Sequence, residues 1–153
     1  MKTYAGNRAL ARFTKLLLDM MFWSGAALTL SLPWTFRWAA RFYPNLDTYY
    51  VLYVAVFMLS GAAAVLIMRE LRRMFKTVLA DDCFVRANVV SLRRMGCLGL
   101  VIAVVTAVRL IVIFTPATVV IILVFSIAAL FSFVLAGVFD RAVSYKLEND
   151  LTI

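Results

Sequence analysis

Long runs with almost no charged residues divide the chain into four apolar segments. These segments cover residues 16–32, 49–68, 95–114 and 117–139. An apolar helix needs about 20 residues to cross a hydrocarbon layer of roughly 30 Å, so each segment is predicted to span a membrane. We expect the first helix to end at Pro33, and the short link Thr115-Pro116 predicts that the last two helices form an antiparallel hairpin. The pattern therefore predicts an all-α, integral membrane four-helix bundle that makes up one domain, residues 1–153.

Composition sharpens this picture, because 65% of the residues are hydrophobic and only 16% are charged. A soluble domain is typically about 45–50% apolar and about a quarter charged, so a water-soluble single domain is excluded. The chain has no histidine, which removes Ser-His and Cys-His nucleophiles and imidazole ligands for metals. Cys83 and Cys97 lack the C-x-x-C spacing of a metal knuckle. We therefore expect no enzymatic activity, no cofactor and no metal site.

Positive charges are distributed unevenly between the two sides of the predicted helices. Of the 16 Lys and Arg residues, four lie in residues 1–15, seven in 69–94 and two in 140–153, whereas the loop 33–48 holds two. Cytoplasmic segments of membrane proteins carry an excess of Lys and Arg, so both termini are predicted to be cytoplasmic. The net charge of +8 therefore indicates orientation and contact with the anionic lipid bilayer, and we expect no direct binding of nucleic acid.

Two charged residues lie within the predicted spans, where ionisable groups are costly and often functional. Asp19 follows Lys15 by four residues on the same helical face, which favours a local ion pair. Arg109 lies five residues before Phe114, about 8 Å from the outer end of its helix. Its guanidinium is predicted to reach outward to the interface or to pair with Asp47, and the alternative is a ligand or ion site.

Small residues recur at four-residue spacing in the last two spans. They are Gly99, Ala103 and Ala107 in the third span and Ala128, Ser132 and Ala136 in the fourth. Such stripes let helix backbones approach closely in lipid. Two arrangements fit them: close packing within one bundle, which we favour, and a face that forms a homo-oligomer.

The longest polar segment, residues 69–94, joins the second and third spans. Apolar residues in its first half recur at helical spacing, with Arg and Lys on the other faces, as in a basic amphipathic helix. This helix either continues the second span or lies along the anionic leaflet. Asp81 and Asp82 predict a turn before a second helix that runs from about Val85 into the third span. We therefore expect a cytoplasmic helical hairpin that serves either as a lipid-contacting connector or as a protein-docking surface.

The tail, residues 140–153, ends in the sequence LENDLTI. This ending resembles the terminal signature of the bacterial domain-of-unknown-function 2975 family, and the stretch 84–96 resembles a loop pattern of that family. The stretch carries Phe84, Asn88, Leu92, Arg93, Arg94 and Gly96, with Cys83 in place of the usual proline and Ala87 in place of the usual glutamate. The resemblance implies a four-helix protein of the bacterial inner membrane without an established enzymatic activity. Members are often encoded beside a small helix-turn-helix transcriptional regulator, which implies a candidate partner.

The polar loop and tail favour one function, and the outer aromatic residues favour another. The first is a regulatory or scaffold protein that docks a partner such as that regulator. Its candidate docking residues are Phe84, Asn88, Arg93, Arg94, Glu148, Asn149 and Asp150. The alternative is a small-molecule or peptide-responsive membrane protein, such as an immunity factor or exporter subunit, that uses Arg109 and an outer aromatic cluster. That cluster, which is also typical of an interfacial aromatic belt, consists of Trp34, Phe36, Trp38, Phe42 and Tyr43.

Overall fold

The computed structural model describes residues 2–42, 49–80, 82–112 and 114–150, and side chains within residues 12–149 of these ranges except that of Val112. The described residues form four helices: α1 (Lys2–Ala40), α3 (Tyr50–Leu79), α4 (Arg86–Val112) and α5 (Pro116–Asp150). Each helix contains a stretch that is long and apolar enough to cross a membrane. The prediction of an all-α chain with four helices of membrane-spanning length is therefore confirmed.

The first helix is longer than expected, because α1 continues through Pro33 to Ala40 instead of ending at the proline. Proline lacks a backbone N–H and removes one hydrogen bond from a helix. A helix that ended inside an apolar layer would leave several backbone groups without partners, so one missing bond costs less than a terminus. The hydroxyl of Tyr50 donates a hydrogen bond to the carbonyl oxygen of Pro33 at 3.0 Å, and this bond ties α1 to α3.

The segment 69–94 is built from the ends of two spanning helices and a short connection between them. α3 runs without a break to Leu79 and α4 begins at Arg86, so residues 80–85 form the whole connection. The basic amphipathic stretch is therefore the last three or so turns of α3, and the spanning helix sets its register.

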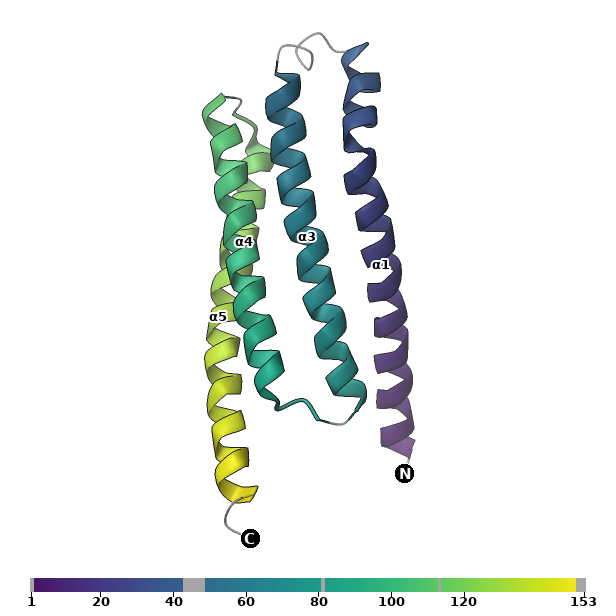
Figure 1. Cartoon of the computed structure of the whole chain (residues 1–153), viewed down its shortest axis with the longest axis vertical. Coiled ribbons are helices and arrows are strands. Elements are labelled where there is room, and N and C mark those ends of the chain that lie inside the picture. The colour runs from purple at the N-terminus through teal and green to yellow at the C-terminus, as the bar shows by residue number, and fades with distance from the viewer. Residues whose placement is uncertain (1, 43–48, 81, 113, 151–153) are drawn as a thin grey trace.

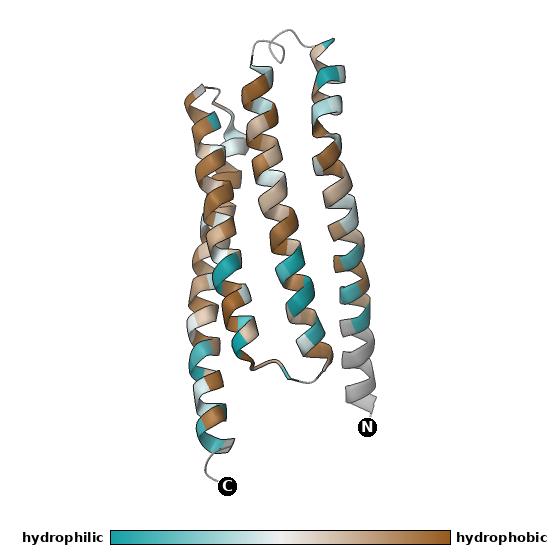
Figure 2. Cartoon of the chain, viewed as in Figure 1, coloured by the Kyte–Doolittle hydropathy of each residue, from teal (hydrophilic) through white to brown (hydrophobic). Residues whose placement is uncertain are grey.

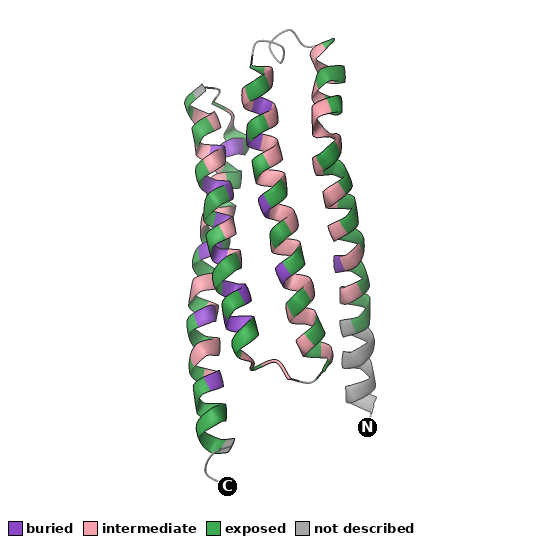
Figure 3. Cartoon of the chain, viewed as in Figure 1, coloured by how far each residue is buried: buried purple, intermediate pink, exposed green. Residues whose placement is uncertain are grey.

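The helices stand side by side in chain order, each antiparallel to the one before it (Figure 1). Among the described residues, backbones approach closely only between consecutive helices, α1 with α3, α3 with α4, and α4 with α5. Both chain ends and the connection 80–85 therefore lie at the same end of the molecule, which we call the polar end. Helix α1 is the least enclosed, since Leu18 is the one buried residue of its described side chains (Figure 3).

Helices α4 and α5 pack closely through small residues. A Cβ added at Gly99 would lie 3.2 Å from the Cβ of Ala129, so glycine at this position lets the two backbones approach. Ala103 is 5% exposed, and Ala129 and Ala136 are 1% exposed. Gly99, Ala103 and Ala136 of the predicted stripes therefore pack within the chain.

On α5 the packed face differs from the predicted four-residue stripe. Ala128 is exposed and Ser132 is half-buried. The buried residues of this helix are Thr118, Ala129, Ala136 and Val143. Steps of seven and eleven residues return nearly to the same side of a helix with 3.6 residues per turn, whereas repeated steps of four drift around it. The long contact with α4 therefore selects the seven-residue and eleven-residue steps.

Substitution of Gly99 by leucine is expected to lower the free energy of unfolding by about 1–3 kcal/mol, because the new side chain would force α4 and α5 apart. Gly137 offers a matched control on α5, since a Cβ added there meets no atom within 4 Å. Gly137→Leu is expected to leave the free energy of unfolding nearly unchanged. Denaturant titration of the full chain in detergent micelles measures both changes, and equal losses would contradict the close α4–α5 contact.

Candidate functional site

Ionic contacts between neighbouring helices gather at the polar end, where Figure 2 shows many of the hydrophilic residues. Asp19 of α1 accepts a hydrogen bond from Arg72 of α3, so its partner is on the next helix and is not Lys15 as expected. The guanidinium carbon of Arg72 also lies 4.5 Å from the centre of the Phe22 ring. A partner on α3 lets one carboxylate join two helices, whereas a local pair would stabilise α1 alone.

A second carboxylate lies at the interface of α3 and α4. Glu70 of α3 is 7% exposed, and one of its oxygens accepts a hydrogen bond from the hydroxyl of Ser91 at 2.7 Å. Its other oxygen lies 3.4 Å from Nη1 of Arg94 on α4 and 3.6 Å from Nη1 of Arg73, one turn along α3. Because each oxygen has a donor, the cost of burying the charge is offset.

A third carboxylate lies at the interface of α4 and α5. Asp140 of α5 pairs through one oxygen with Arg86 and through the other with Arg93, the latter at 3.1 Å. Lys146, further along α5, pairs with Asp82 of the connection at 2.8 Å. Each pair of consecutive helices is thus joined at the polar end by one carboxylate and at least one arginine.

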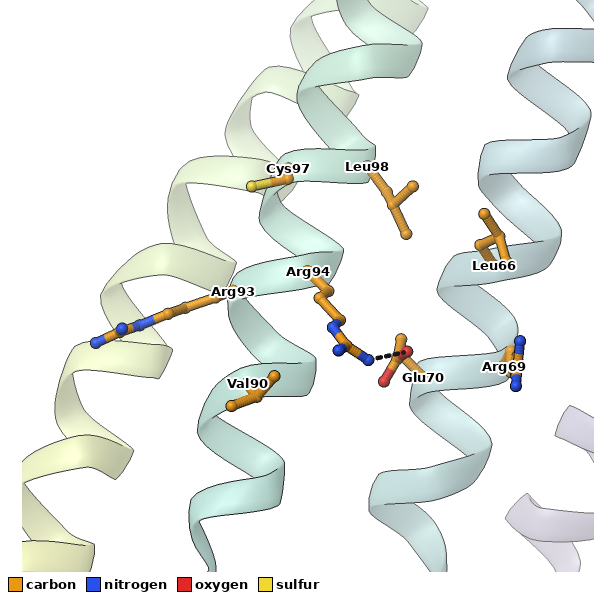
Figure 4. Close-up of a pocket in the computed structure, with 8 residues that line it drawn as sticks. All are labelled: Leu66, Arg69, Glu70, Val90, Arg93, Arg94, Cys97 and Leu98. Carbon is orange, nitrogen blue, oxygen red and sulfur yellow. Dashed lines mark hydrogen bonds and ion pairs between the residues drawn. The ribbon is translucent and has the colours of Figure 1, made fainter.

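A groove of about 680 Å³ lies between α3 and α4 beside Glu70 (Figure 4). Leu66 and Leu98 line it on the side toward the middle of the helices, and Arg69 and Arg94 line it at the polar end. Figure 4 shows Arg94 reaching from α4 to Glu70 on α3. An apolar floor with cationic groups at its aqueous end suits lipid chains with anionic headgroups.

The predicted docking residue Asn88 is buried. Its side chain is 2% exposed, and its amide donates hydrogen bonds to the hydroxyl of Thr77 at 2.7 Å and to the carbonyl oxygen of Cys83 at 2.8 Å. Asn88 therefore holds the α3–α4 connection in place and offers almost no surface to a partner.

Three other predicted docking residues keep exposed surface near this connection. Phe84 packs against Phe139 of α5 with ring centres 5.5 Å apart and stays 48% exposed. The side chains of Arg93 and Arg94 remain 60% and 57% exposed despite their ion pairs. These residues lie on one end of the molecule and remain accessible.

The end of α5 contains the remaining predicted residues. Glu148 and Asn149 are exposed, and the side chain of Asp150 lies outside the described part of the chain. Sequence reasoning missed their neighbours Tyr145 and Leu147, which are 67% and 57% exposed. The signal for them was two large side chains next to charged residues, Tyr145 before Lys146 and Leu147 before Glu148.

Arg109 points into the molecule instead of outward to the interface. Its guanidinium carbon lies 5.4 Å from the ring centre of Tyr53 and 5.3 Å from that of Phe57. Its Nε is buried and has no hydrogen-bond partner. The faces of two aromatic rings on α3 attract a cation, which accounts for the inward direction. The predicted alternative partner, Asp47, lies outside the described residues.

The outer aromatic cluster divides into two groups. The members exposed on the surface, as an interfacial belt requires, are Trp34, Trp38 and Phe42. Phe36 turns inward instead and lies 6.1 Å from the ring centre of Tyr53 and 5.3 Å from that of Phe57. Tyr43 lies outside the described residues. Phe36 thus joins α1 to the aromatic rings that hold Arg109.

Sequence reasoning missed the interface acids Glu70 and Asp140. Glu70 stands in a run of arginines between Arg69 and Arg72, and Asp140 directly precedes Arg141. An acid within a basic segment was the available signal, but the partner helix is not visible from one segment. Within the side chains that the structure describes, no group of three His, Cys, Asp or Glu residues gathers closely enough to hold a metal ion.

These features define a class of small all-α protein with four helices of membrane-spanning length and ion-paired helix ends. The chain belongs to the family described as "Protein of unknown function (DUF2975)", which matches residues 34–153. The match covers α3, α4, α5 and the end of α1, and it confirms the family that the sequence resembles. No curated protein and no solved structure is significantly similar to the chain.

Substitution of Glu70 by glutamine is expected to lower the free energy of unfolding by about 1–3 kcal/mol, because the buried hydroxyl of Ser91 and the guanidinium of Arg94 lose a charged acceptor. The matched control is Asp82→Asn, which removes an exposed ion pair with Lys146. Exposed pairs contribute about 0–1 kcal/mol, so this change is expected to have the smaller effect. Denaturant titration in micelles compares the two variants. A larger loss from Asp82→Asn would show that burial does not decide the strength of these contacts.

Proposed function

We propose that the protein is a regulatory or scaffold protein of the bacterial cytoplasmic membrane that docks a soluble partner at its polar end. The observation that carries this proposal is the group of exposed apolar side chains among the charged residues there. Phe84, Tyr145 and Leu147 are 48%, 67% and 57% exposed, although the ion pairs around them mark a polar environment. Exposed aromatic and apolar side chains with a polar rim are typical of protein interfaces.

The proposed docking surface surrounds the projecting end of α5 and consists of Phe84, Tyr145, Leu147, Glu148 and Asn149, with Tyr145 and Leu147 on nearly opposite sides of the helix. Figure 1 shows that α5 extends beyond the α3–α4 connection, so its last turns project from the end of the molecule. The ion pair between Lys146 and Asp82 fixes α5 against this connection. The surface therefore lies on a helix that is continuous with the packed part of α5, which favours binding of a folded partner.

The candidate partner is a small helix-turn-helix transcriptional regulator. Members of the family are often encoded beside such a regulator, and this association is what points to it. Glu148 is the one charged residue of the docking surface and suits a local contact with a basic side chain of the partner. Capture of the regulator at the membrane would control how much of it reaches DNA.

The proposal requires the polar end to face the cytoplasm, as the excess of Lys and Arg there favours. We expect Ser144→Cys on α5 to react with a membrane-impermeant maleimide only after cells are permeabilised. Arg37→Cys, near the opposite end of α1, is expected to react in intact cells. Both variants are made in a background with Cys83 and Cys97 replaced by serine. The reversed pattern would place the docking surface outside the cell.

The double variant Tyr145→Ala/Leu147→Ala is expected to reduce capture of the co-expressed helix-turn-helix regulator about tenfold or more, because buried anchors dominate interface energies. These changes test the docking surface more specifically than deletion of the tail after Phe139. That deletion would also remove Asp140 and so break its ion pairs with two arginines of α4. Quantitative co-purification from membranes measures capture. The control Trp34→Ala/Trp38→Ala removes exposed aromatic residues at the other end and should change nothing. Undiminished capture by the Tyr145/Leu147 variant would refute the docking surface.

A second candidate function is a small-molecule-responsive membrane protein, for example an immunity factor or exporter subunit. The observation that favours it is the inward direction of Arg109, whose guanidinium lies among aromatic rings at a cavity between the helices. A binding site inside the molecule would let a small molecule act on helix packing directly.

A further inference from the structure

A cavity of about 290 Å³ lies between the helices, away from the ion pairs of the polar end, and residues of all four helices line it. Its lining includes Leu28, Leu32, Ser60, Ile102, Arg109 and Phe125. The volume is close to the lower limit of ordinary ligand pockets, which hold about 300–1,000 Å³. Most of the lining is apolar, with one cationic group at Arg109.

Arg109 lacks a counter-charge in the part of the chain that the structure describes. Arginine stays protonated at any physiological pH. None of the ion pairs among the described side chains includes Arg109, and its Nε is buried without a hydrogen-bond partner. The rings of Tyr53 and Phe57 supply only cation–π contacts, which leave the buried Nε without a hydrogen-bond acceptor. Among the described residues, this cation in largely apolar surroundings therefore has no anionic acceptor.

Ser60 gives a second, independent indication of a missing ligand. Its Oγ is buried and has no hydrogen-bond partner, and a buried hydroxyl without a partner is destabilising. Ser60 and Arg109 are the two described residues that leave a buried side-chain polar atom unpartnered, and both line this cavity. The two unsatisfied groups come from different helices, α3 and α4, and meet at the same space.

We propose that this cavity binds a single-chain anionic amphiphile of the long-chain fatty acid type, with its carboxylate on Arg109 and its chain along the apolar lining. A guanidinium matches a carboxylate through two parallel hydrogen bonds. From Arg109 to Ile102 the lining extends along seven residues of α4, about 10 Å. This length accepts a head and the first part of one chain, and the volume does not accept the two chains of a phospholipid.

This inference deepens the second candidate function and rests on it for its biological purpose, since it names the ligand class of the same site. Binding itself depends only on the cavity and on Arg109. If the ligand binds but a change in its concentration alters no cellular response, the second candidate function fails and the site remains. If the ligand does not bind, the site assignment fails, and a response to another compound would still support the function.

The experiment measures equilibrium binding of radiolabelled oleate to the delipidated full chain in neutral detergent. Wild type is expected to bind oleate, and Arg109→Leu is expected to bind it about tenfold more weakly or worse, because a charged hydrogen-bond partner is lost. The matched control is Arg141→Leu, which removes an exposed arginine of α5 outside the cavity and should bind like wild type. Oleyl alcohol has the same chain without the charge and should bind weakly to wild type and to Arg109→Leu alike.

Three outcomes would overturn the proposal. Equal binding of oleate by wild type and Arg109→Leu would remove the role of the guanidinium. Equal competition by oleyl alcohol would show a purely apolar site, and displacement of oleate by equimolar phosphatidylglycerol would indicate a phospholipid site. Photo-labelling of the wild-type chain with a diazirine-bearing fatty acid needs no variant. Label on Ser60 or Ile102 supports the proposal, and label confined to lipid-facing residues such as Ile111, which is 85% exposed, contradicts it.

Discussion

Ion pairs between neighbouring helices hold the four helices together at one end, with one carboxylate at each interface. Asp19 joins α1 to α3, Glu70 joins α3 to α4, and Asp140 joins α4 to α5. Lipid chains are as apolar as leucine, so apolar helix faces gain little by leaving lipid for one another. Directional polar contacts and close backbone approach must therefore fix the order of the helices. Helix α1 depends on such contacts most, because Leu18 is its one buried side chain in the described part.

The opposite end is held by contacts of another kind. The hydroxyl of Tyr50 bonds to the carbonyl of Pro33, and Phe36 packs on the rings that hold Arg109. Close approach of α1 and α3 also needs Gly61, where an added Cβ would lie 2.7 Å from a side-chain atom of Thr29. These contacts bring the backbones together without filling the space between four helices. The same end therefore combines tight pairwise contacts with the cavity at Arg109.

Much of the fold was predictable from the sequence, but its pairings were not. Apolar length and charge distribution predicted four spans and two chain ends on one side, because both depend on composition within a segment. The partners of Asp19 and Arg109 lie on α3, and local spacing could not indicate them. The predicted end of the first helix at Pro33 was wrong, because a helix in apolar surroundings can continue through a proline. The sequence placed Asn88 in a polar loop, which is typical of a surface residue. It is buried because its amide bonds to Thr77 and Cys83 across the α3–α4 connection.

Buried polar groups that have partners and those that lack them lie in different parts of this protein. At the polar end each described interface carboxylate has an arginine on a neighbouring helix, and buried Asn88 and Ser91 have partners. A chain that satisfies its buried groups so consistently has no structural reason to leave the Nε of one guanidinium and one hydroxyl without a partner among the described residues at one cavity. Violations of local rules in folded proteins concentrate where binding occurs. Arg109 and Ser60 are such violations, so the cavity between the four helices is where the packing leaves room for a ligand.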